Sequence, residues 1–144
     1  MDITEVRVKL IQNQTDKLRG FATITLGDSL VVRDLKIIEG AQGLFLAMPS
    51  RKLCDRCAKC GGKNNLRARY CNDCGVRLKE FRGEVDERGR PRLYADIAHP
   101  INQRSRDFVQ ARVIEAYHDE VERSKLEGYV AVRFDDLDYE AYDA

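Results

Sequence analysis

Four cysteines in the middle of the chain are spaced so that their thiolates could close around one metal ion. Cys57 and Cys60 form one pair, Cys71 and Cys74 form the second, and ten residues separate the pairs. A glycine follows each pair at once, and glycine tolerates the positive φ of a tight turn under a metal. Four sulfur ligands leave no open coordination position for water, as in structural zinc sites. The pattern predicts one structural Zn2+ per chain.

A fifth cysteine, Cys54, leaves a second assignment open. Cys54 and Cys57 have the same spacing as Cys57 and Cys60, but only the latter pair is followed by glycine, so we favour Cys60 as the ligand. Cys54 would then be an incidental thiol or a minor competitor for the metal. The chain carries neither a phosphate-binding glycine loop nor a serine in a nucleophile elbow. We therefore expect no enzymatic function.

Charge is distributed unevenly along the 144 residues, although the net charge is only +1. Residues 51–92 carry 13 basic and 6 acidic side chains, whereas residues 135–144 carry five acidic and no basic ones. Closely spaced cations attract phosphate, and the release of displaced counterions drives association. The acidic end could fold back on the basic segment and compete with phosphate, or it could act only as a solubilising tail.

Many of these cations surround the cysteine pairs, which makes nucleic acid a candidate partner. They are Arg56, Lys59, Lys63, Arg67, Arg69, Arg77, Lys79 and Arg82. Among them we assign Lys63, Arg67 and Arg69 as nucleic-acid contacts. The neighbours that could add hydrogen bonds or base stacking are Asn64, Asn65 and Tyr70. A solvated ribbon, or one that docks a protein, would show the same charges.

Sequence on both sides of this segment has the pattern of a half-buried sheet. Residues 3–11 and 20–26 alternate between apolar and polar side chains, and residues 30–38 are rich in β-branched types. With a short apolar run at 44–48, they predict an antiparallel meander. Residues 93–98 could return as a strand, and residues 129–134 could add another.

A helix is expected over residues 102–125, where apolar side chains recur at helical spacing. The side chains on this arc are Val109, Val113, Ala116, Tyr117 and Val121. Asn102 or Ser105 could cap its start, and Gly128 is a plausible stop. The fold class predicted is α+β, an antiparallel sheet with a C-terminal helix. Its domain, residues 1–52 plus 93–134, is interrupted by a zinc-ribbon insert, 53–92, and followed by the acidic tail, 135–144.

Two segments that flank the insert carry a family resemblance. Residues 43–52 (GLFLAMPSRK) lead into the insert, and residues 96–102 (DIAHPIN) lead out of it. Together with residues 34–40 (DLKIIEG) and the N-terminal strand, they resemble the stage V sporulation protein G (SpoVG) family. Members of that family join the two motifs by a short hairpin, whereas this chain places the cysteine segment there.

The resemblance implies a homodimer and a DNA- and RNA-binding regulator linked to septation and sporulation. It also implies nucleic-acid contacts in the basic stretch after the second motif, at Arg104, Arg106 and Arg112. Arg51 and Lys52, which end the first motif, are either a further phosphate contact or an ordinary strand exit.

We therefore predict a non-enzymatic, nucleic-acid-binding regulator whose zinc ribbon adds phosphate contacts. The alternative is a protein-interaction module in a division or regulatory complex, with the ribbon docking a partner. No apolar run approaches the ~20 residues that span a bilayer, and the N-terminus has a strand pattern rather than that of a signal peptide. A cytoplasmic location is expected, where thiols stay reduced and clustered cysteines favour metal over disulfides.

Overall fold

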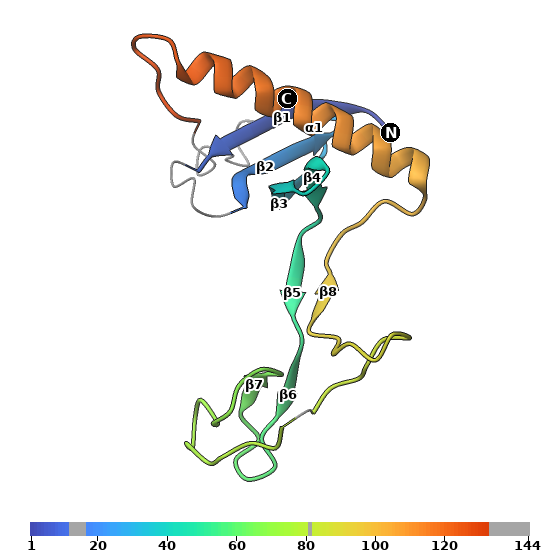
Figure 1. The fold of residues 1–144 in the computed structure, drawn as a ribbon, viewed down its shortest axis with the longest axis vertical. Coiled ribbons are helices and arrows are strands. Elements are labelled where there is room, and N and C mark those ends of the chain that lie inside the picture. The colour runs from blue at the N-terminus through green and yellow to red at the C-terminus, as the bar shows by residue number, and fades with distance from the viewer. Residues whose placement is uncertain (12–16, 81, 133–144) are drawn as a thin grey trace. The chain divides into compact units, whose positions relative to one another are not determined.

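The computed structural model describes residues 1–11, 17–80 and 82–132, which form two compact units (Figure 1). The core unit comprises Met1–Pro49 and the described residues from Ala98 onward. The insert unit comprises Ser50–Ile97. The acidic tail expected at 135–144 lies outside the described residues.

Four strands of the core unit form one antiparallel sheet in chain order, β1-β2-β3-β4. They are β1 (Ile3–Leu10), β2 (Leu18–Leu26), β3 (Leu30–Gly40) and β4 (Gly43–Ala47). The predicted meander is therefore confirmed. The register between β2 and β3 shifts between Ala22 and Ile24, where the opposing Asp34 has a φ of 63°. An extra residue in this conformation is typical of a β-bulge, which increases the local twist of the sheet.

The helix α1 (Gln103–Ser124) packs against β1, β2 and β4 and buries the core between itself and the sheet (Figure 1). Its buried apolar residues, Val109 and Val113, belong to the arc predicted from the sequence. They meet buried side chains of the strands: Ile3, Val8, Ala22, Ile24, Leu35, Ile37 and Leu46. The α+β class, a sheet with a C-terminal helix, is thus confirmed.

Both ends of α1 can be compared with the residues that the sequence offers as its cap and its stop. Asn102 caps the start, because its side chain accepts the Ser105 backbone N–H at 2.8 Å. The helix ends at Ser124, so the predicted range of 102–125 is confirmed to within one residue at each end, whereas Gly128 lies four residues beyond the end. None of the described residues 129–132 is in a strand. Instead, the Tyr129 hydroxyl donates to Glu120 at 2.6 Å and holds the chain against the helix end.

The insert unit consists of short strand pairs and turns. β5 (Ser50–Lys52) pairs with β8 (Tyr94–Asp96), and β6 (Cys54–Arg56) pairs with β7 (Lys63–Asn65). Backbone bonds join the two pairs, since Leu53 N–H donates to Leu93 O at 2.8 Å and Leu53 O accepts from Leu66 N–H at 3.1 Å. Across the described parts of both units, no helix has the length and apolar character needed to cross a membrane.

Candidate functional site

Each cysteine pair lies in a turn that the following glycine closes. Gly61 N–H donates to Cys57 O at 2.8 Å, and Gly75 N–H donates to Cys71 O at 3.0 Å. These glycines have φ values of 76° and 77°, in the left-handed region that side chains with a Cβ disfavour. The two knuckles therefore have the positive-φ turn expected from the sequence.

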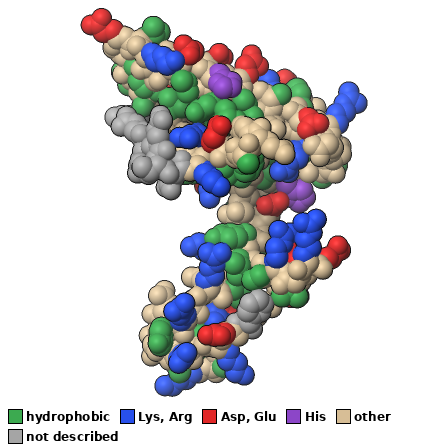
Figure 2. Space-filling view, in the orientation of Figure 1, with side chains coloured by type: hydrophobic (Ala, Val, Ile, Leu, Met, Phe, Trp, Pro, Cys, Tyr) green, Lys and Arg blue, Asp and Glu red, His purple; other side chains and the backbone are tan. Residues whose placement is uncertain are grey.

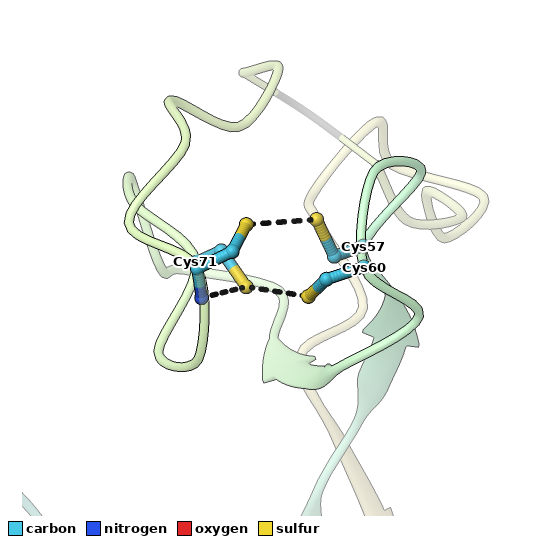
Figure 3. Close-up of side chains that lie close together, drawn as sticks. Cys57, Cys60 and Cys71 are labelled. Carbon is cyan, nitrogen blue, oxygen red and sulfur yellow. Dashed lines mark hydrogen bonds between the residues drawn. The ribbon is translucent and has the colours of Figure 1, made fainter.

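The four thiols of the knuckles converge on one point (Figure 3). Sulfur atoms of Cys57 and Cys74 are 3.8 Å apart, those of Cys60 and Cys71 are 3.5 Å apart, and all four lie within 4.8 Å of one another. Ligands about 2.3 Å from a tetrahedral zinc ion lie about 3.8 Å from one another. The cluster therefore has the donors and the dimensions to hold a metal ion. Among the described residues, Cys54 is not part of this cluster.

Asn64 on β7 links the two knuckles from beneath. Its side chain is buried, and its amide nitrogen donates to Cys71 Sγ at 3.4 Å and to Gly62 O at 3.3 Å. Its amide oxygen accepts the Asn72 backbone N–H at 2.7 Å. From the sequence, Asn64 is a candidate for hydrogen bonds to nucleic acid, but its polar atoms are used inside the insert unit. No sequence pattern predicts that Asn64 joins the knuckles, because its contacts with Cys71 and Asn72 form only when the second knuckle folds onto β7.

Electrostatics within the cluster favour a bound cation. N–H groups of Cys74 and Asp73, together with the Asn64 amide, lower the pKa of Cys71 to about 6. Gly62 N–H also donates toward Cys60, but the neighbouring sulfurs, chiefly that of Cys71, outweigh it and raise the pKa of Cys60 to about 12. The contact between the two sulfurs therefore favours a thiolate at Cys71 beside a thiol at Cys60. Because four thiolates need a compensating positive charge, metal binding would release the remaining thiol protons.

The cations assigned to nucleic acid belong to both units. Lys63, Arg67 and Arg69, with Arg51 and Lys52 of β5, are exposed in the insert unit. In the core unit, Arg104 and Arg106 are exposed near the start of α1, whereas Arg112 is half-buried. Within the part of the chain that the structure describes, no ion pair involves any of these side chains. Figure 2 shows Lys and Arg side chains in blue over the insert unit.

Arg82 differs from the other cations that surround the cysteines. Its side chain is only 11% exposed and forms an ion pair with Asp55 at 2.7 Å. The same guanidinium donates to the carbonyl oxygens of Asn65, Ala68 and Lys79 at 2.8–2.9 Å. Arg82 therefore holds the insert together rather than facing solvent. The sequence does not distinguish the buried Arg82 from the exposed cations around it, because all of them are Lys or Arg in one polar segment.

Comparison with known proteins relates most of the chain to one family. A family model described as SpoVG matches residues 1–119. A relative from Lachnospira eligens is 39% identical over 117 residues, which cover 81% of this chain and 91% of the relative. Another, from Clostridium beijerinckii, is 34% identical over 128 residues, 89% of this chain and all of the relative. A third, from Finegoldia magna, is 35% identical over 123 residues, 85% of this chain and 80% of the relative. All three are named "Putative septation protein SpoVG".

Proposed function

The chain belongs to the SpoVG family, and from this premise we propose that it is a non-enzymatic regulator that binds DNA or RNA. The names of its relatives support a link to septation. The charges of the chain support nucleic acid as the ligand.

One observation carries this proposal: the insert presents cations that form no ion pair with any acidic side chain among the described residues. Residues 51–92 hold 13 basic against 6 acidic side chains, and Lys63, Arg67 and Arg69 are exposed without an ion pair among the described residues. Folding would gain nothing from keeping such charges close together, because like charges repel. Phosphate groups, which release counterions on binding, would supply the missing negative charge.

For the metal, we infer zinc in a structural role. Tetrahedral sites of four cysteines hold zinc or an iron–sulfur cluster, and a single point of convergence for four sulfurs fits one zinc ion per chain. Bound there, the ion would join the two knuckles and supply no catalysis, because the four sulfurs fill its coordination sphere.

We also propose a homodimer, which would double the cationic surface and raise its effective affinity for a long ligand. On β4, side chains alternate between the two faces of the sheet, so Phe45 points away from the face on which Leu46 is buried. Phe45 is 42% exposed and lies opposite Ile38 of β3. This apolar patch is a candidate surface for the second copy.

A salt titration tests the proposal. Fluorescence anisotropy would follow binding of short single-stranded and duplex probes over a range of salt concentrations. Direct phosphate binding predicts affinity that falls log-linearly with salt. Arg67→Ala and Arg69→Ala should each reduce the slope by about 0.7–0.9. Arg90→Ala is the matched control, because the charge of Arg90 is already paired with Asp86 at 3.0 Å.

Failure to bind either probe near physiological salt would reject the proposal. That result would favour the alternative function, a protein-interaction module in a division or regulatory complex with the insert as its docking surface. An equal loss of slope in Arg90→Ala would show that the effect follows net charge rather than the assigned contacts.

A further inference from the structure

A hollow of about 480 Å3 lies in the insert unit beside the second knuckle. The described residues that line it are 66–70, 77–80 and Arg82. Its volume is in the range of small-ligand clefts. No part of the metal cluster lines it, so it is a separate feature of the same unit.

Tyr70 contributes an aromatic side chain to this hollow and is 60% exposed. Two backbone contacts hold Tyr70 in place. Tyr70 forms an antiparallel bridge with Arg77, and the next residue, Cys71, donates its N–H to Val76 O at 2.8 Å. Residues paired directly across an antiparallel bridge project to the same face. The ring is therefore presented next to the Arg77 side chain from a backbone that the knuckle holds in place.

The walls of the hollow are cationic. Arg67, Arg69, Arg77 and Lys79 line it, and within the described residues none of them forms an ion pair. Glu80 is the one acidic side chain among the residues that line it. Arg82 also lines the hollow, but its guanidinium contacts Asp55 and carbonyl groups, so the cations left for a ligand are Arg67, Arg69, Arg77 and Lys79.

The exposed ring of Tyr70, with Arg69 and Arg77 beside it, could stack on a nucleobase that has an uncovered face. In a duplex both faces of a base are covered by its neighbours, whereas an unpaired base can stack on an aromatic side chain while cations contact its phosphates. We propose that this hollow binds single-stranded nucleic acid, with one base stacked on Tyr70 and the flanking phosphates near Arg69 and Arg77. This inference rests on the proposed nucleic-acid binding and specifies the form of the ligand.

The test compares strands with and without bases. Anisotropy of the full chain would be measured with short oligo-dT and oligo-rU strands, an abasic strand with the same number of phosphates, and a duplex. The wild-type chain should bind the base-bearing strands more tightly than the abasic strand, by about 5- to 100-fold for one stacked base. The higher affinity of the base-bearing strands would support stacking, and a preference for either sugar would identify DNA or RNA as the ligand.

Substitutions assign this preference to Tyr70. Tyr70→Ala should abolish the difference between base-bearing and abasic strands and leave the salt slope unchanged, because no cation is removed. Tyr70→Phe should keep the difference, since it retains the ring. The matched control is Tyr94→Ala, because Tyr94 is 47% exposed in the same unit but does not line the hollow. The metal content of each variant would show that its knuckles remain intact.

Three results would overturn the inference. Equal wild-type affinity for abasic and base-bearing strands would exclude stacking while leaving nucleic-acid binding itself in place. The same loss in Tyr94→Ala, or in Tyr70→Phe, would remove the ring of Tyr70 as the cause. Absence of binding to every probe would reject the proposed function together with this inference.

Discussion

The core unit and the insert unit bury different kinds of side chain. Among the described residues of the core unit, nine apolar residues from the sheet and α1 form one buried cluster. In the described part of the insert unit, the buried residues are Cys57, Asn64 and Cys71. Each fully buried aliphatic side chain stabilises a fold by about 1.5–3 kcal/mol, so the core unit can fold on apolar burial alone. The described residues of the insert unit form no such core, and we expect the order of this unit to depend on a metal.

The largest effect that would test this comparison is loss of the metal ligands. Cys71→Ser should abolish metal binding and unfold the insert unit, because zinc contributes about 10–16 kcal/mol of apparent folding free energy to small zinc modules. Strands β1–β4 and α1 should stay folded. Hydrogen exchange by unit, together with the metal content of the purified chain, would measure both outcomes.

Cys54→Ser is the control for this experiment and should retain one metal ion per chain, since Cys54 is outside the cluster. Release of metal by this variant would favour Cys54 as a ligand. If the amides of the insert unit stay protected from hydrogen exchange without metal, the order of this unit does not depend on the metal.

A substitution in the apolar core should destabilise the core unit and leave the metal site of the insert unit intact, the opposite of Cys71→Ser. Leu35 is fully buried on β3, and Leu35→Ala should lower the free energy of unfolding of the core unit by about 2–5 kcal/mol. The metal content should not change. Denaturant unfolding followed by circular dichroism would measure the loss, with Leu30→Ala as the control because Leu30 is 59% exposed.

Asn64 tests whether the insert depends on more than its four sulfurs. Asn64→Ala removes the donor to Cys71 Sγ and leaves the Asn72 N–H without its partner. Outer hydrogen-bond partners of metal ligands change metal affinity by about 10- to 100-fold, and we expect a loss of that size. Competition with a chelator would measure it. Asn72→Ala should bind metal normally, because the contact of Asn72 uses its backbone; an equal loss there would contradict this role of Asn64.

The smallest effect concerns pH and the end of α1. Burial raises the pKa of Glu120, but hydrogen bonds from Arg123 and Tyr129 outweigh it and hold the pKa below its usual value. A carboxyl with a lowered folded pKa stabilises the fold above its unfolded pKa, and this contribution is lost as pH falls through the folded value. Acid should therefore destabilise the core unit in part through Glu120, by roughly 1 kcal/mol.

Unfolding measured against pH would isolate this contribution. Glu120→Gln should flatten the profile across the acidic range, whereas Glu122→Gln should not, because Glu122 is exposed and carries only a surface pair with Lys125. An unchanged profile in Glu120→Gln would exclude the contribution.

Local patterns in the sequence predicted most of the fold. β-Branched residues predicted β3 and a short apolar run predicted β4. Alternation predicted β1 and β2, and helical spacing predicted that Val109 and Val113 face the core. Both patterns follow from backbone geometry over a few residues. The strand expected at 129–134 was wrong for its described residues, because alternation supplies no partner strand and Tyr129 bonds to Glu120 instead.

The sequence by itself determined the metal-capable cluster. The spacing of Cys57 with Cys60 and of Cys71 with Cys74, and the glycines that follow, encode two turns whose sulfurs point to one side. Family membership was also contained in the sequence, since its motifs are contiguous in the chain.

Only the tertiary structure decided which polar residues serve the fold and which face solvent. Asn64 and Arg82 belong to the interior of the insert unit, whereas Tyr70 and Arg77 line an open hollow. The physical reason is that residues of the same type differ in their hydrogen-bond and ion-pair partners, and the fold determines which partners lie within reach. The partners that join separate segments, such as Cys71 for Asn64 and Asp55 for Arg82, are 7 and 27 residues away, a separation that local pattern does not encode.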